Sequence, residues 1–328
     1  MSFAPQQGER WTLAALAGGA VLAAVTLPPP GEGLPLAPLL LLAIGLFTLG
    51  IPHGCFDQEV WRLLRKRRKR RVHLLAFLVG YLLLVLLYAL LWIASPLLGL
   101  LSFYLLTWYH WGVGDRDWET FVRRQPIGGG QRWDRAVFVF VRGGLPMALP
   151  FLFHPERVEW FLQACLDLFP NAGTPALAPA VALVGRGGSA LVLAGAVLLS
   201  ARQRARWQRW QTEFLGLALL FLLLPPLLAV GLYYVFWHAG RHLLRLRLSF
   251  APEWARERAL ILFSGCIILL ATAVLISGVL SLLREIDEKL ILALLLVSTC
   301  CLTLPHTLVV DWLDRREPEG RTTPQHKT

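Results

Sequence analysis

Long apolar blocks, rather than an alternation of apolar and polar residues, run along most of this chain. Tyr81 to Trp92 and Leu215 to Leu224 are almost unbroken apolar runs that are rich in leucine. Strands that cross a bilayer show alternating segments of roughly ten residues, so these blocks predict membrane helices instead. The predicted helical segments are residues 11–27, 35–52, 73–94, 96–113, 135–153, 176–200, 211–224, 227–244, 259–281 and 289–306.

The composition agrees with a protein that lies in a membrane. Hydrophobic residues make up 56% of the chain, and the mean hydropathy is +0.56. We therefore predict an all-α, polytopic bundle of about 8 to 10 transmembrane helices. Residues 1–313 are expected to form a single integral membrane domain, and residues 314–328 a tail. Because Glu9 lies beside Arg10 and no clear cleavage site follows, Trp11 to Leu27 is interpreted as a retained helix rather than a signal peptide.

The basic residues predict how the helices are oriented in the membrane. The formal net charge is +11, and Arg62 to Arg71 holds a dense basic run between two apolar blocks. Lys and Arg accumulate in cytoplasmic loops, so we interpret this run as a topology signal rather than a nucleic-acid site. Counting crossings from it also places the arginine-rich segments 114–135 and 201–209 in the cytoplasm.

The prolines Pro225 and Pro226 interrupt the apolar stretch 211–244. Either this stretch is one long broken helix, or two short antiparallel helices meet at the proline pair. A single crossing would place Arg241, Arg245 and the arginines that follow outside, against the charge rule. We therefore favour a reversal at the prolines, with both termini in the cytoplasm of a multi-pass protein of the inner (plasma) membrane.

Histidines at or near the ends of apolar segments are the main indication of function. With the predicted topology they all lie near the cytoplasmic ends of their helices. An imidazole is costly to place in hydrocarbon, so several at one depth indicate a common partner, and a metal ion is the obvious one. These histidines are His53, His110, His238, His242 and His306.

The ligand type narrows the choice of metal. His238 and His242 have the i, i+4 spacing that places two imidazoles on one face of a helix. Neutral nitrogen ligands suit iron, copper or zinc, and iron(II) fits oxygen chemistry best. The five cysteines contain no CxxC pair, which argues against a zinc-thiolate site or a disulfide framework. His306 is either a fifth ligand, a group near the metal that carries protons, or an interfacial histidine.

Carboxylates and aromatic residues follow the histidine motifs closely. Asp57, Asp115 and Asp311 lie four or five residues after a histidine, where a carboxylate can orient a ligand imidazole, although ordinary interfacial charge is equally compatible. Arg142 lies inside an apolar segment, so we expect it to pair with a carboxylate. The aromatic residues fit either a membrane interface or the wall of a lipid substrate passage. They are Trp108, Tyr109, Trp111, Tyr233, Tyr234, Phe236 and Trp237.

These motifs together resemble the Brp/Blh family, the membrane-embedded β-carotene 15,15′-dioxygenases found with microbial rhodopsins. The resemblance rests on motifs that occur in the same order along the chain. They are Pro52-His53-Gly54 with Asp57, aromatic-His110 with Asp115, Arg142-Gly143 to Pro146, Tyr233-Tyr234-x-Phe236-Trp237-His238-x-x-Arg241-His242, and Pro305-His306.

The resemblance implies an iron(II) centre held by His53, His110, His238 and His242. It also implies that O2 cleaves the central double bond of β-carotene to give two retinal molecules, with a rhodopsin as a possible acceptor. Cys55, Ala239 and Trp111 depart from the family pattern of Ala, Ser and Phe. These departures concern the shape of the pocket, and hence substrate preference, more than metal binding.

Two other classes of function compete with the enzyme. An ion or metal transporter predicts polar residues through the full depth of several helices, whereas these blocks are nearly pure Leu, Val and Ala away from the histidines. A non-catalytic factor that binds retinal or carotenoid and assists assembly of a rhodopsin would keep the same pocket, so the sequence leaves it open.

Overall fold

Helices and turns form all of the structure that the computed structural model of the chain describes, and no strand is present within those residues. The all-α class predicted from the apolar blocks is therefore confirmed. The described residues are 49–67, 73–123, 131–169, 177–202, 204–249 and 288–314, with 10, 13–14, 16–21, 45, 69, 71, 125 and 127.

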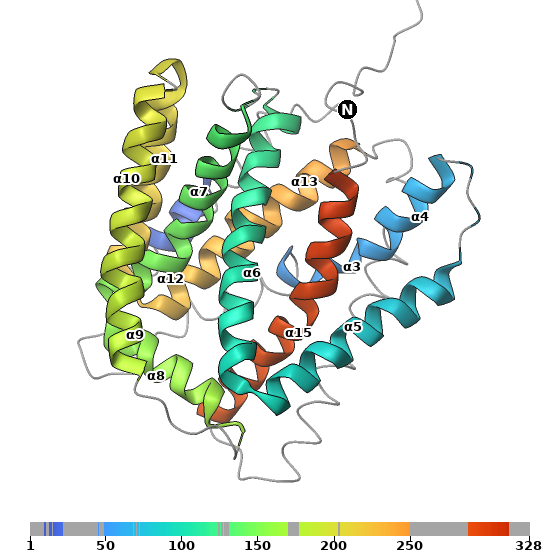
Figure 1. The fold of residues 1–328 in the computed structure, drawn as a ribbon. Helices are drawn as coiled ribbons and strands as arrows, with labels where there is room; N and C mark the ends of the chain where they lie inside the picture. Colours follow the sequence, from blue (N-terminus) through green and yellow to red (C-terminus); the bar gives the residue numbers. More distant parts are fainter. Residues whose placement is uncertain are drawn as a thin grey trace, which may run out of the picture.

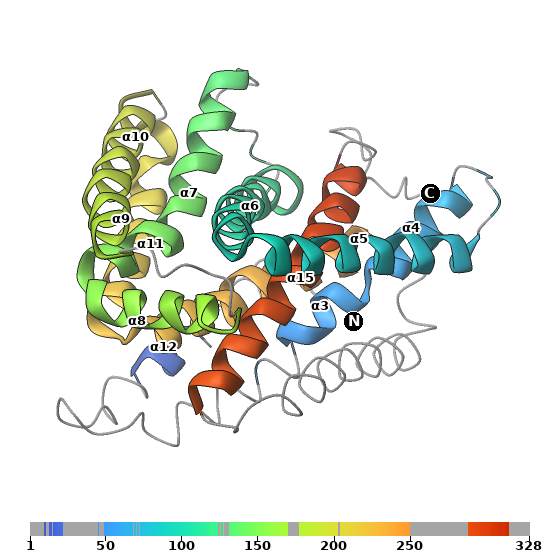
Figure 2. The same cartoon turned by 60° about the horizontal axis from the view of Figure 1, so that its bottom comes forward.

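Helix α6 (Pro96–Asp117) lies in the middle of the bundle (Figure 1). On one side it packs against α7 (Arg132–Phe153), with α10 (Ser189–Arg202) and α11 (Arg204–Leu223) beyond. On the other side lie α5 (Leu74–Ala94), α15 (Glu288–Asp314) and α4 (Asp57–Arg67), and Figure 2 shows the same sequence of helices from another direction.

Shorter elements complete the described fold. Three of them are π-helical, a form that often marks a functional site. The short α-helices are α3 (Ile51–Cys55), α8 (Pro155–Leu166), α9 (Leu177–Leu183), α12 (Pro226–Leu232) and α13 (Gly240–Ser249). The π-helices are η2 (Trp118–Val122), η4 (Val184–Gly188) and η5 (Tyr233–Ala239).

Four described helices are long and apolar enough to cross a membrane: Leu74–Ala94, Arg132–Phe153, Pro179–Arg202 and Leu296–Leu313. Helix α6 is of similar length, but its Trp, Tyr and His residues make it less apolar. The predicted segment 259–281, the tail 314–328 apart from Asp314, and most of segments 11–27 and 35–52 lie outside the described residues.

The outer helices expose leucines, as expected where a helix faces lipid. On α5, Leu75 is 76% exposed, and only Val85, Tyr88 and Trp92 are buried. Leu191 on α10 and Leu215 on α11 are exposed in the same way. Such broad apolar exposure would be costly in water and is neutral in hydrocarbon, so these surfaces fit a bilayer.

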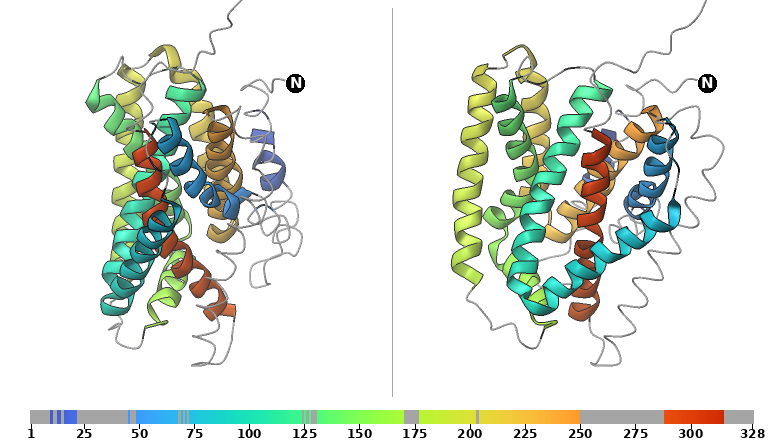
Figure 3. Two further views of the ribbon diagram at one scale, coloured as in Figure 1. Left: turned by 90° about the vertical axis from the view of Figure 1, so that its right-hand side faces the viewer. Right: turned by 45° about the vertical axis from the view of Figure 1, so that its right-hand side comes forward.

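The chain reverses direction at the proline pair, as the loop charges predict. Helix α11 ends at Leu223, and α12 begins at Pro226. Pro225 and Pro226 have no N–H to continue the helix, and Pro225 instead accepts the first hydrogen bond of α12, from Ala229 N at 2.9 Å. From this point α12, η5 and α13 run back across the bundle (Figure 1 and Figure 3).

Glycines allow α6 and α7 to approach each other closely. Gly143 of α7 lies against the backbone of Trp108, and Gly112 of α6 lies against the backbone of Val139. A Cβ on either glycine would overlap a carbonyl oxygen of the opposite helix. This contact fixes the position of α6 and therefore of His110.

We predict that Gly143→Ala destabilises the protein, because the backbone of α6 has to move. Overpacking of this kind costs about 1 to 3 kcal/mol. Gly80→Ala on α5 is the matched control, since a Cβ there meets no atom within 4 Å and Ala favours helix. Thermal unfolding in detergent checks this, and equal midpoints for the two variants would contradict it.

Candidate metal centre

Five histidines from five separate elements meet in the interior of the bundle. His53 lies on α3, His110 on α6, His238 on η5, His242 on α13 and His306 on α15. All five side chains are buried. The sequence placed them at one depth, and the structure brings the imidazoles together at one site.

The imidazole rings surround a common point. His53 lies 5.7 Å from His238, 5.8 Å from His242 and 4.7 Å from His306, measured between ring centroids. His110 lies 4.8 Å from His238 and 5.0 Å from His306. One nitrogen from each of His53, His110 and His238 lies within 4.8 Å of the others, a spacing that a single metal ion can bridge.

Local backbone features direct these rings inward. The π-helix η5 ends at Ala239, so His238 and His242 do not follow the plain α-helical spacing assumed from the sequence, yet both rings face His53. Gly114 leaves room for the His238 ring, because a Cβ there would lie 3.2 Å from it. Pro52 occupies the first turn of α3, a position where proline's missing N–H has no helical partner.

The donor atoms fit a metal ion bound by nitrogen. His110 Nε2 and His238 Nε2 lie 3.1 Å apart. Two imidazole nitrogens that bind one first-row ion at right angles, each about 2.1 Å from it, are separated by about 3 Å. His306 Nε2 is buried with no hydrogen-bond partner, which is costly for a polar atom unless a ligand takes it up.

Hydrogen bonds on the outer side fix two of the rings. His53 Nδ1 contacts the Gly50 carbonyl oxygen, and the Tyr234 hydroxyl donates to the same oxygen at 3.1 Å. His306 Nδ1 lies 2.9 Å from both oxygens of Asp57. Such partners fix the orientation of a ligand imidazole and the nitrogen that it presents to a metal.

The three predicted carboxylates therefore have different positions. Asp57, which follows His53 in the sequence, binds the imidazole of His306, because the chain turns at Phe56 and Asp57 begins a new helix. Asp115 lies five residues after His110, on a different face of α6, and points toward α7. Asp311 accepts a hydrogen bond from Tyr109 at 3.2 Å.

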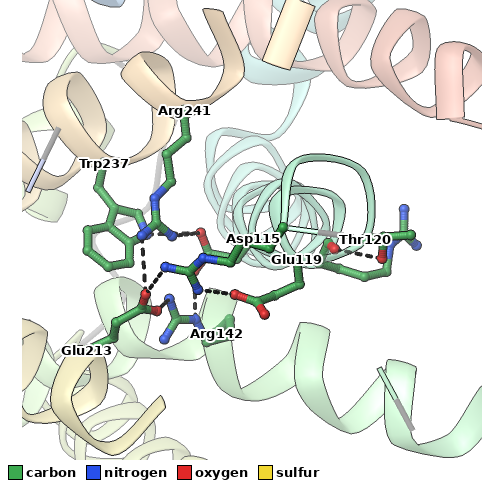
Figure 4. Close-up of polar contacts among 9 residues, drawn as sticks. Asp115, Glu119, Thr120, Arg142, Glu213, Trp237 and Arg241 are labelled. Carbon is green, nitrogen blue, oxygen red and sulfur yellow. Dashed lines mark hydrogen bonds and ion pairs between the residues drawn. The ribbon is translucent and has the colours of Figure 1, made fainter. Parts of the chain in front are cut away.

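A buried network of ion pairs joins α6, α7, α11 and α13 (Figure 4). Arg142 Nε donates to Asp115 at 2.6 Å and its terminal nitrogen to Glu213 at 2.7 Å, which confirms the predicted pairing of Arg142 with a carboxylate. Arg241 contacts both carboxylates, and its guanidinium lies 3.5 Å above the ring of Trp237. The charges are thus balanced inside the bundle.

This network holds the histidine-bearing elements together. Trp237, next to His238, donates its indole N–H to Asp115 on α6 at 2.9 Å. Asp115 and Arg241 also line a small pocket whose other walls include His238 and His242. The network therefore joins η5 and α13 to α6 directly beside the proposed ligands.

Sequence reasoning missed Glu213 and Arg241 as parts of this arrangement. Glu213 binds three arginines, Arg123, Arg142 and Arg241. The sequence does contain an indication of this role. Glu213 is a lone acidic residue within the apolar segment 211–224, where a charged side chain needs a buried partner.

The predicted aromatic residues divide into two groups. Trp111 and Tyr234 border the histidines, with ring centroids 5.9 Å and 6.3 Å from His238. The others lie away from the imidazoles. Trp108 donates to the Phe140 carbonyl oxygen of α7, and the ring of Tyr109 is 43% exposed. Tyr233, Phe236 and Trp237 pack in the hydrophobic core or against the ion network.

The described cysteines lie outside the group of histidines that can hold a metal. All of them are buried and free of disulfides. They are Cys55, Cys165, Cys300 and Cys301.

Apolar helices long enough to cross a membrane thus enclose a group of buried histidines that could hold a metal ion. The chain belongs to the β-carotene 15,15′-dioxygenase family, because the sequence model of that family matches residues 44–314. The matched segment contains all five histidines of the cluster, and the family resemblance seen in the motifs is confirmed.

Named relatives agree with this assignment. The probable β-carotene 15,15′-dioxygenase Blh of Halobacterium salinarum is 30% identical over 93% of this chain and 91% of its own length. The β-carotene 15,15′-dioxygenase of the uncultured marine bacterium 66A03 is 25% identical over 86% of this chain and 96% of its own. The probable dioxygenase Brp of Halobacterium salinarum is 28% identical over 62% of this chain. No solved structure matches the chain.

We predict that Glu213→Gln destabilises the protein strongly, because it leaves buried arginines without their carboxylate. Breaking a buried ion pair from one side costs about 3 to 5 kcal/mol. Glu156→Gln on the exposed surface of α8 is the matched control and is expected to change stability by less than about 1 kcal/mol. Thermal unfolding in detergent compares them, and similar midpoints would show that the network contributes little.

Proposed function

We propose that this chain is an iron(II)-dependent enzyme that uses O2 to cleave β-carotene at its central 15,15′ double bond, giving two all-trans-retinal molecules. The observation that carries the proposal is the convergence of His53, His110, His238 and His242 from four elements into one buried site. Membership of the dioxygenase family and the names of the relatives support the same reaction.

The four histidines are the proposed iron ligands. Neutral imidazoles leave the ion its full 2+ charge, and four of them leave positions open on an ion that prefers six ligands. Bound iron(II) supplies the activation of O2, which does not react readily with an alkene by itself. The overall reaction is balanced without another reductant, because each carbon of the broken double bond takes one oxygen atom and O2 accepts the electrons.

The surrounding residues hold the reactants and exclude water. Trp111 and Tyr234 provide aromatic surfaces beside His238 against which a polyene can pack. The Tyr234 hydroxyl is engaged with the Gly50 carbonyl, so its ring has a fixed position. No proton has to be removed from the alkene, so the site requires no general base. Burial of the histidines inside the bundle limits the access of water to the reaction.

We also propose that the protein is a multi-pass protein of the plasma membrane with both termini in the cytoplasm. The basic run at residues 62–71 and the reversal after α11 support this arrangement. Because β-carotene dissolves in the bilayer, it is expected to reach the site sideways between helices rather than from water.

The proposal predicts that bacteria which make β-carotene lose their orange colour and accumulate retinal when they express this chain. His238→Ala is expected to abolish retinal formation, because it removes a ligand at the centre of the cluster. The matched control is His73→Ala, an exposed histidine at the start of α5, which should form retinal like the wild type. Chromatography of cell extracts quantifies both carotenoid and retinal.

Absence of retinal from well-expressed wild type would overturn the proposal. If such a protein bound carotenoid or retinal without turnover, it would be an assembly factor. If it changed the distribution of metal ions across the membrane instead, it would be a transporter. Formation of apocarotenals of unequal length would show that cleavage occurs away from the central double bond of the polyene.

A further inference from the structure

His306 has the features of a metal ligand, although the proposed four-histidine site does not include it. Its side chain is buried, with 5% of the residue exposed. Its ring centroid lies 4.7 Å from His53, 5.0 Å from His110 and 5.5 Å from His242, which is comparable with the 5.7 Å between His53 and His238 and the 4.8 Å between His110 and His238.

The two nitrogens of His306 have different surroundings. Nδ1 lies 2.9 Å from both oxygens of the Asp57 carboxylate, a contact that favours a proton on Nδ1. Nε2 then carries the lone pair and is buried without a hydrogen-bond partner. An acceptor nitrogen in this state is unfavourable in a protein interior unless a hydrogen-bond donor, a water molecule or a metal ion occupies the space in front of it.

Asp57 also accepts a hydrogen bond from a residue on a third helix, α5. The Tyr81 hydroxyl on α5 donates to Asp57 Oδ2 at 3.1 Å. Tyr81, Asp57 and His306 thus form a chain of hydrogen bonds that runs from α5 through α4 to α15. Histidines that bind metals commonly donate the N–H of one ring nitrogen to a carboxylate and bind the metal through the other nitrogen.

We propose that His306 is a fifth ligand of the metal, bound through Nε2, and that Asp57 and Tyr81 are positioning residues that orient it. The inference rests on the proposed metal site, although it does not depend on which carotenoid is cleaved. Five imidazoles would hold a bound ion more firmly than four, and the ion would supply the activation of O2.

The test measures metal binding rather than turnover. Purified apo-protein in detergent is titrated with Co2+, a probe for iron(II), and X-ray absorption of the loaded protein counts the bound imidazoles. Wild type is expected to show five imidazoles, and His306→Ala four with weaker binding. Asp57→Asn is expected to keep the fold and to lower Co2+ affinity by about 10- to 100-fold, as loss of a partner of a ligand does.

Controls separate a ligand from a structural histidine. His73→Ala should bind Co2+ like the wild type, because His73 is exposed at the start of α5. Tyr81→Phe should weaken binding less than Asp57→Asn, since it removes only the outer hydrogen bond. Unfolding midpoints of the apo-proteins identify any variant that fails to fold. If His306→Ala does not fold, the Co2+ affinity of Asp57→Asn tests the proposal.

Equal imidazole counts and equal Co2+ affinities in wild type, His306→Ala and Asp57→Asn would overturn the inference. That result would leave retinal formation by the wild type unaffected. Conversely, if the wild type bound Co2+ through five imidazoles but formed no retinal, the proposed function would be refuted and the fifth ligand would be supported.

Discussion

The cost of burying polar groups in an apolar interior is the constraint on which the rest of the structure depends. Five imidazoles and several arginines and carboxylates lie inside a bundle whose outer helices are almost entirely apolar. The buried arginines of the ion network are offset by carboxylates, as Arg142 is by Asp115 and Glu213. The imidazoles are only partly offset by hydrogen bonds, so a metal ion among them would stabilise the fold as well as provide the chemistry.

Helix α6 connects the parts of the site. Gly112 allows α7 to lie against it, His110 joins the imidazole cluster, and Asp115 binds Arg142 and Trp237. The same helix therefore contributes to the packing interface, the imidazole cluster and the ion network within a few residues. A shift of α6 would change all three at once, which links the stability of the bundle to the geometry of the histidines.

The helical class, the reversal at Pro225 and the meeting of the histidines could be predicted from the sequence, because hydropathy, loop charge and the cost of buried imidazole act on local segments. The hydrogen-bond and ion-pair partners of the site residues could not be predicted from the sequence. Asp57 orients His306 instead of His53, since a turn at Phe56 separates the neighbours in sequence. The π-helix η5 and the role of Glu213 depend on contacts between distant helices, which periodicity within one segment does not reveal.

The position of the bound metal tests the account most directly. Crystals of iron-loaded protein, measured above and below the iron absorption edge, would locate the ion by anomalous scattering. The account predicts one strong peak enclosed by His53, His110 and His238, with imidazole nitrogens about 2.1 Å away. A peak elsewhere, or none in protein that actively forms retinal, would contradict it.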